Sequence, residues 1–449
     1  MSRHLIIGRY GSDDRVVCPA AADEQVTPID IVASQKQLGY GIGHALSDLR
    51  KLGVVPSEIG LDLLVLAALV YAADTRISRK TESEDSWTRE IRLVVPVSDL
   101  ARWNATVPVL ERSLNFLTGD IWSIGFRARP PRFAMAVSAV QHLIDPPFDE
   151  VSLFSGGLDS LIGAIDLLES GQKPLLVSHS AEGAVSKAQG DCYDRLTTHY
   201  KGKGLERLRL WMGFPKNLVK GVASDETTRG RSFLFFAAGV FAGTGFRRAF
   251  NLRAPENGLI ALNVPLDIHR LGALSTRTTH PFYIARWNEL LQTLGIPGHI
   301  HNPYWNKTKG EMVAGCANPK LLMELVPLSL SCASPTKGRW QHHGTEHCGY
   351  CLPCLIRRAA LGAKDPTPYT LANLKAEAWN PTKAKGEQIR SFQFAIERLR
   401  QRPGLAKLLI HKPGPLYDNA GNHDELADVY SRGLAEVGAL LAGVKTRPS

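Results

Sequence analysis

The sequence predicts an α/β protein with a central parallel sheet, an α+β region before it and a helical region after it. Short apolar runs alternate with helical patterns from residue 150 to residue 262, which is typical of a parallel sheet covered by helices on both faces. Pro146 and Pro147 end the region before this pattern, because consecutive prolines interrupt regular structure. Beyond about Asp365 the chain is charged and mostly helical in pattern.

These boundaries predict three domains: an N-terminal α+β accessory domain over 1–146, an α/β domain over 149–365 and a helical C-terminal region over 366–449. The first domain is expected to hold a strand at 4–7, an apolar helix at 59–73, a loop at 80–85 and a strand pair at 90–96 and 121–128. The second is expected to hold strands at 150–154, 174–177, 208–211 and 258–262, and helices at 161–168 and 232–242. A helix over 426–441 ends the third.

The composition is that of an ordinary globular protein, with 44% hydrophobic and 21% charged residues. A net charge of +10 favours anionic partners or simply supports solubility. Nucleic-acid binding is permitted but not argued, because the basic C-terminal third lacks interleaved aromatic residues. No signal-peptide pattern is present, and the apolar run 63–73 is shorter than the roughly 20 residues that span a bilayer. We therefore expect a soluble, cytoplasmic protein that does not enter a membrane.

The sharpest local pattern is a glycine turn between the predicted strand 150–154 and the helix that follows. It consists of Ser155, Gly156, Gly157, Leu158, Asp159 and Ser160. Two glycines allow a tight turn whose N–H groups approach a phosphate, and the helix N-terminus adds partial positive charge. The Lys and Ser/Thr of a Walker A loop are missing. The sequence predicts a binding loop for the phosphates of ATP, with Mg²⁺ on Asp159; the alternative is an ordinary turn capped by Asp or Ser.

Such a loop holds the β- and γ-phosphates and leaves the α-phosphorus open to a carboxylate oxygen. Pyrophosphate then departs and the substrate carries AMP. The departing charge needs cations, and the candidates are Arg229, Arg231, Lys307 and Lys309, each of which has a surface role as its alternative. Arg231 opens the predicted helix 232–242, which can direct it at the nucleotide.

Cys348, Cys351 and Cys354 form a CxxCxxC run, and Cys332 precedes them. Four thiolates suit a closed, structural Zn²⁺ site, and an odd total of seven cysteines favours metal binding in a reducing compartment over disulfides. Buried unligated thiols and an iron–sulfur cluster are the alternatives. Three nearby histidines are rival ligands: His342, His343 and His347.

The turn matches the SGGxDS signature of PP-loop ATP pyrophosphatases at every defined position. Together with the later SC…CGYCLPCLIRR it resembles the 7-cyano-7-deazaguanine synthase (QueC) family over about residues 149–365. The resemblance implies a sheet of the adenine nucleotide alpha hydrolase-like (HUP) type, ATP on the turn and zinc on the four cysteines. It also implies that a 7-carboxy-7-deazaguanine carboxylate is adenylated and then attacked by ammonia.

The chain departs from that family in several places. It has additional residues at both ends, and Ser178–Gly183 stands where the family has YGQ. The family's substrate-side segment is replaced by Pro255–Gly258 and Ser275–Pro281, which we expect to line an acceptor pocket; a solvated loop is the alternative. His280 within it is a candidate general base, although a histidine before proline also serves structural roles.

The longer form resembles the QueC-like proteins of bacterial antiphage operons, the QatC type of the Qat system. This resemblance implies a carbon–nitrogen ligase that forms AMP and pyrophosphate and passes the deazaguanine to an amine of a partner protein. The candidate catalytic residues of such an enzyme are Asp159, Arg231, Lys309 and His280. The alternatives are ammonia as acceptor, a tRNA-modifying enzyme, and a nucleotide-sensing scaffold without catalysis. A thiolating enzyme would need a reactive thiol outside the zinc cluster, for which Cys18, Cys192 and Cys316 remain.

Overall fold

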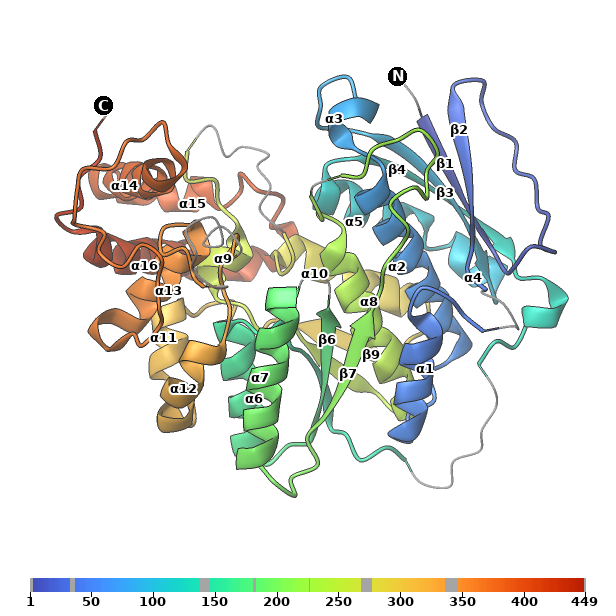
Figure 1. Ribbon diagram of the computed structural model, residues 1–449, viewed down its shortest axis with the longest axis horizontal. Coiled ribbons are helices and arrows are strands. Elements are labelled where there is room, and N and C mark those ends of the chain that lie inside the picture. The colour runs from blue at the N-terminus through green and yellow to red at the C-terminus, as the bar shows by residue number, and fades with distance from the viewer. Residues whose placement is uncertain are drawn as a thin grey trace.

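A computed structural model describes residues 3–32, 37–137, 145–180, 183–225, 227–267, 277–335 and 346–447. It shows an α/β protein with two sheets, both parallel throughout (Figure 1). The first sheet has the order β2-β1-β3-β4, from β1 (Arg3–Arg9), β2 (Glu24–Asp30), β3 (Glu90–Val97) and β4 (Ile121–Ala128). The second has the order β7-β6-β5-β8-β9, from β5 (Glu150–Leu153), β6 (Pro174–Ser180), β7 (Glu206–Trp211), β8 (Phe250–Arg253) and β9 (Gly298–His301).

The helices before and between the strands surround these sheets. They are α1 (Ile42–Lys51), α2 (Glu58–Arg76), α3 (Arg79–Glu82), α4 (Leu100–Asn104), α5 (Val107–Thr118), α6 (Leu158–Glu169), α7 (Gly183–His199), α8 (Arg231–Gly243), α9 (Gly258–Leu262) and α10 (Pro281–Thr293). The later helices are α11 (Lys309–Ala314), α12 (Pro319–Leu325), α13 (Leu352–Leu361), α14 (Ala384–Gln401), α15 (Ala406–Leu409) and α16 (His423–Leu441).

The N-terminal region differs from the predicted α+β domain, because its four strands all pair in parallel. The strand missed by sequence in this region is β2, where Pro28 interrupts the run and the apolar Val26 is exposed while the polar Thr27 is buried. Part of the predicted loop 80–85 also belongs to α3, a single helical turn.

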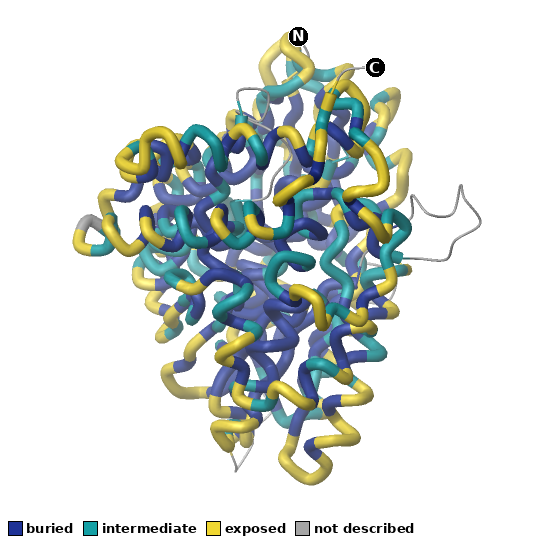
Figure 2. Tube along the Cα trace, turned by 90° about the vertical axis from the view of Figure 1, so that its left-hand side faces the viewer, coloured by how far each residue is buried: buried dark blue, intermediate teal, exposed yellow. Residues whose placement is uncertain are grey.

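Helix α2 joins the two sheets into one body. Nearly all its side chains are buried, since it packs on β1 and β3 of the first sheet and on α8, which in turn covers β5, β6 and β8 of the second. A mostly apolar helix that is buried on every side requires such surroundings. One apolar core therefore runs from Ile6 to Ile300 through both sheets, and Figure 2 shows the buried trace through the middle of the molecule.

The second sheet provides a ligand crevice by its topology. The chain builds β5, β6 and β7 outward in one direction, then returns to place β8 and β9 on the other side of β5. Figure 1 shows α6 and α7 on one side of this sheet and α8 and α10 on the other. Where the strand order reverses, the connections after two neighbouring strands run to opposite faces and leave a crevice at their carboxyl ends. Here those strands are β5 and β8.

One predicted strand of this sheet is wrong, and one predicted helix begins earlier than expected. The segment 258–262 is the short helix α9, because the Asn257 side chain accepts a hydrogen bond from the Ile260 N–H at 3.2 Å and caps it; the strand, β8, lies earlier. A short apolar run fits either structure by periodicity alone. The helix expected from residue 161 begins at Leu158, directly after the glycine turn.

The C-terminal helices pack into a second core. Apolar side chains of α14 and α16 meet those of α9 and α13, and the helix predicted over 426–441 lies within α16. In Figure 1 these helices lie opposite the N-terminal sheet, beyond α6 and α7. Among the described residues, no helix is long and apolar enough to cross a membrane.

Candidate functional site

A cavity of about 270 Å³ lies at the crevice between β5 and β8. The turn after β5, the segment after β8 and the start of α8 supply most of its wall. The lining residues are Leu153, Ser155, Ser160, Val185, Arg231, Ser232, Phe235, Ala254, Pro255, Glu256, Thr278, Thr279 and Leu330. The cavity thus brings together the predicted phosphate loop, Arg231 and parts of both segments expected to line an acceptor pocket. Ser275 and Thr276 lie outside the described residues.

Gly156 shapes the turn. Its φ of +78° is in the left-handed region, and a Cβ there would stand 2.9 Å from the backbone nitrogen of Gln189. The Gln189 amide donates to the carbonyl oxygens of Ser155 and His179, which fastens the turn to β6. Only glycine fits this position without displacing α7.

The turn presents its N–H groups to hydroxyl oxygens. The Gly157 N–H donates to Ser155 Oγ at 3.3 Å and the Leu158 N–H to Ser331 Oγ at 3.2 Å. Ser155 Oγ also lies 3.1 Å from Ser160 Oγ. The next two N–H groups, of Asp159 and Ser160, lie in the first helical turn and have no acceptor within the helix. Phosphate oxygens can take the places of these hydroxyls, so the turn suits an anion.

Asp159 and Lys309 form a buried ion pair below the turn, with Lys309 Nζ 2.7 Å from Asp159 Oδ1. Asp159 Oδ2 accepts hydrogen bonds from the Asn257 N–H at 3.1 Å and its side-chain amide at 2.8 Å. Both carboxylate oxygens are therefore engaged by the protein. The predicted Mg²⁺ would have to compete with Lys309 for Asp159, whose contacts join α6, α11 and the segment after β8.

Of the other three predicted cations, one lines the cavity and two do not. Arg231 lines the cavity at the start of α8, and its guanidinium donates to His179 Nδ1 at 3.3 Å and to the His179 carbonyl at 3.4 Å. Arg229 instead stacks 3.7 Å over the Trp87 ring and donates to the Thr118 carbonyl, so its guanidinium is engaged by the N-terminal region. Lys307 is exposed over the Tyr304 ring. Arg229 and Lys307 are thus not at the turn.

His179 was not singled out by sequence. Burial, and then the charge of Arg231, lower the pKa of His179 to about 3. The neutral ring accepts from Arg231 and contacts Tyr71 of α2 edge-on, with 5.4 Å between ring centroids. Through these contacts the N-terminal region helps to position Arg231.

The structure does not support His280 as a general base. It is fully buried, and its Nδ1 accepts the Phe282 N–H at 3.2 Å, so that it caps α10. Burial lowers the pKa of His280 to about 3. Thr278 and Thr279 line the cavity, whereas the side chain of His280 packs against Phe116. A capping histidine before Pro281 explains its place in the sequence.

We expect the thermal stability to fall as the pH is lowered from 7 to 5. In the folded protein the pKa of His179 and of His280 is about 3, whereas each titrates near 6.5 when unfolded. The unfolded chain therefore binds more protons below pH 6.5, so this stability is complete above that pH and is lost toward pH 3. Each histidine accounts for about 2 kcal/mol at pH 5. Melting curves should show a shallower pH dependence for His280→Asn, which keeps a capping side chain; an unaltered slope would contradict the assignment.

Four cysteines gather at the start of α13, as predicted. The sulfurs of Cys332, Cys348, Cys351 and Cys354 all lie within 4.8 Å of one another, and the Cys332–Cys351 and Cys348–Cys354 pairs are 3.9 Å apart. Tetrahedral Zn²⁺ with bonds of about 2.3 Å places its sulfur ligands about 3.8 Å apart. The Cys351 N–H donates to Cys348 Sγ at 3.3 Å, an arrangement typical of a bound thiolate. The cluster can therefore hold a metal ion such as zinc.

His347 is not part of this group. Its Nε2 accepts the Ser331 N–H at 3.1 Å, and burial lowers its pKa to about 3. The rivals His342 and His343 lie outside the described residues. Ser331 therefore bonds His347 through its N–H and the turn through its hydroxyl, while the Leu330 N–H donates to the Gly156 carbonyl at 2.8 Å. Residues 330–332 connect the turn directly to the cysteine cluster.

Two of the remaining cysteines are poor nucleophiles. Burial raises the pKa of Cys192 to about 12 and that of Cys316 to about 12. Thiolates are the reactive form, so neither suits the thiol chemistry of a tRNA-thiolating enzyme.

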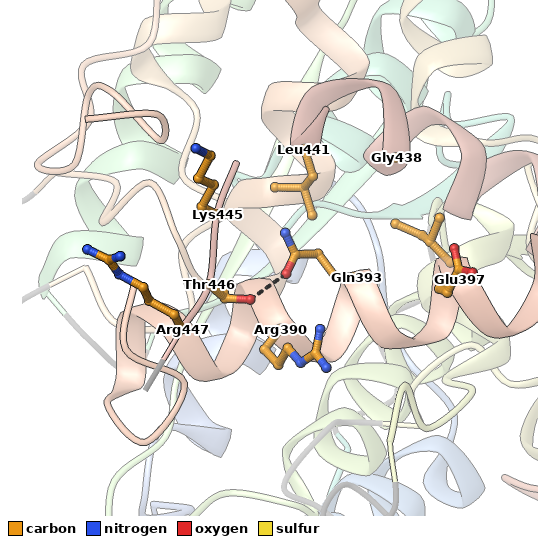
Figure 3. Close-up of a pocket in the computed structure, with 9 residues that line it drawn as sticks. Arg390, Gln393, Glu397, Gly438, Leu441, Lys445, Thr446 and Arg447 are labelled. Atoms are coloured by element: carbon orange, nitrogen blue, oxygen red, sulfur yellow. Dashed lines mark hydrogen bonds between the residues drawn. The ribbon is translucent and has the colours of Figure 1, made fainter. Parts of the chain in front are cut away.

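A larger cavity, of about 560 Å³, is lined by residues of α14, of α16 and of the segment 445–447, and shares no lining residue with the first cavity (Figure 3). Its rim carries Arg390, Lys445 and Arg447, and Thr446 donates to Gln393 across it at 2.7 Å. Glu397 is paired with Arg400 on the same helix. Neither the glycine turn nor any of the predicted catalytic residues lines this cavity, so volume alone does not make it the better candidate for catalysis.

No family model, curated protein or solved structure matches the chain significantly. The case for a function therefore depends on the site itself and on the sequence motifs.

Proposed function

We propose that the protein is an ATP-dependent ligase of the PP-loop pyrophosphatase type, which adenylates a carboxylate and passes the acyl group to an amine. The observation that carries this proposal is the position of the SGGLDS turn: it follows β5 at the strand-order reversal and opens α6, with Arg231 beside it. Nucleotides bind at such crevices, and a helix N-terminus with two glycines before it suits their phosphates.

In this proposal the turn binds the β- and γ-phosphates, which exchange with the hydroxyls now bonded to its N–H groups. Arg231 faces the cavity at the start of α8 and offers a cation to the developing charge on pyrophosphate. Lys309 holds Asp159, and with it the first turn of α6, in place. The five-stranded order is that of a doubly wound nucleotide-binding sheet, which supports the HUP-type assignment.

The substrate we propose, on the sequence resemblance, is a 7-deazaguanine carboxylate. A cavity of about 270 Å³ lies near the lower end of the range for small-molecule sites, roughly 300–1,000 Å³. The acceptor we favour is an amine of a partner protein in a cytoplasmic antiphage system, with ammonia as the alternative. Zinc, held by the four cysteines, has a structural role, because four sulfur ligands leave no open coordination position.

Pyrophosphate exchange into ATP tests the proposal. With 7-carboxy-7-deazaguanine present the protein should exchange labelled pyrophosphate into ATP, and without it exchange should remain at background. Exchange that ignores the carboxylate would contradict the adenylation step. Mass spectrometry of a co-expressed operon partner then decides the acceptor: added mass on its amino terminus supports the protein amine, and free nitrile product supports ammonia.

A further inference from the structure

Glu256 lines the same cavity as Ser155 and Ser160 of the phosphate loop. Glu256 lies three residues beyond the end of β8. Since the crevice forms at the carboxyl ends of β5 and β8, this position brings the Glu256 carboxylate to the cavity. The Asn302 side chain grips its backbone twice: Oδ1 accepts the Glu256 N–H at 3.2 Å and Nδ2 donates to the Glu256 carbonyl at 2.7 Å. These two hydrogen bonds fix the backbone of Glu256 at the wall of the cavity.

The side chain is also held. Thr279 Oγ1 donates a hydrogen bond to Glu256 Oε2, and Thr279 itself lines the cavity. Among the described residues, the Glu256 carboxylate accepts this hydrogen bond through Oε2, and its other oxygen, Oε1, remains for a ligand. Thr279 belongs to one of the two segments that stand where the resembled family has its substrate-side residues.

The surroundings of the Glu256 carboxyl bring its pKa close to neutral pH. Burial above all, and the Asp159 carboxylate, raise the pKa of Glu256, whereas the Thr279 hydrogen bond and the Lys309 ammonium lower it, and together they bring it to about 7. Arg231 lines the same cavity from α8. A base acts best when its pKa is near the working pH, so Glu256 is suited to accept a proton from an amine.

We propose that Glu256 is the general base of the acyl-transfer step, the role that His280 cannot fill. The inference rests on the proposed function. The amine nitrogen attacks the carbonyl carbon of the acyl adenylate, and the C–N bond forms as the C–O bond to AMP breaks. The electron pair of that bond leaves on the AMP phosphate oxygen. The proton lost from nitrogen passes to Glu256 Oε1 and returns to solvent after AMP departs. The acceptor class is a primary amine that enters from the Glu256 side.

Glu256→Gln tests this by separating the two half-reactions. Pyrophosphate exchange reports the adenylate, whereas transfer is followed with a simple primary amine and, separately, with hydroxylamine. Hydroxylamine is already neutral at pH 7 and a strong nucleophile, so it needs little help from a base. We expect transfer to the primary amine to fall roughly 100-fold in the variant. Hydroxylamine transfer and exchange should fall far less, by about fivefold at most.

The matched control is Glu324→Gln, which makes the same substitution on the exposed surface of α12. In the wild type, primary-amine transfer should also rise with pH through about 7, and this inflection should be absent from the variant. Equal loss with both nucleophiles, or no loss with the primary amine, overturns the inference. A wild type that transfers normally but lacks the inflection overturns it as well, even where the variant does not fold. Absence of exchange in the wild type overturns the proposed function itself.

Discussion

Gly156→Val is expected to reduce carboxylate-dependent pyrophosphate exchange by roughly 100-fold or more, because it removes the phosphate-binding geometry as a whole. The residue has a φ of +78°, which a β-branched side chain rarely adopts, and its Cβ would stand 2.9 Å from the Gln189 nitrogen. The turn must then move, and the N–H groups of the following residues lose their common direction. Nucleotide binding, measured by calorimetry, should weaken together with exchange.

Gly171→Val is the matched control. Gly171 lies in the turn after α6 and has a φ of +80°, so the backbone strain is the same, but a Cβ there meets no atom within 4 Å. Both variants should lose similar stability from strain, and only Gly156→Val should lose exchange. If the two behave alike, strain alone explains the loss and the phosphate assignment is wrong.

Sequence predicted those parts of the site that consist of residues close together in the chain. The glycine turn and the CxxCxxC run each need only neighbouring residues and a strand or helix beside them. The structure confirms the strand–turn–helix setting of the first and the close sulfurs of the second.

The parts that sequence missed depend on tertiary surroundings. Glu256 and His280 lie in two segments that were both expected at the pocket, yet burial and hydrogen bonding give them opposite roles. The carboxylate of Glu256 faces the cavity, with its pKa raised, and the ring of His280 turns away to cap a helix. Arg229 and Arg231 are two residues apart, but only Arg231, the first residue of α8, lines the cavity, whereas Arg229 precedes the helix and bonds the Thr118 carbonyl. Periodicity and residue type carry no information on such orientation.

Cys354→Ser is expected to have the other large effect. Cys354 is fully buried in the cluster, so the variant should lose a ligand that water cannot easily replace. Zinc measured by atomic absorption should fall from about one ion per chain to a small fraction of that value. Loss of a structural metal should lower the free energy of unfolding by roughly 4 kcal/mol or more. The control, Cys18→Ser, alters an isolated and partly exposed thiol, and should leave both quantities unaltered.

The same substitution should weaken the phosphate loop from a distance. Cys332 follows directly after Leu330 and Ser331, which bond the Gly156 carbonyl and the Leu158 N–H. When the metal no longer fixes Cys332, these two hydrogen bonds lose their anchor, and pyrophosphate exchange should fall with zinc content. Chelation of the wild type should reproduce the loss, and added zinc should restore it to the wild type but not to Cys354→Ser. If exchange persists in the zinc-free protein, the connection through residues 330–332 is not required, and the turn holds its shape through Gln189 and Lys309 alone.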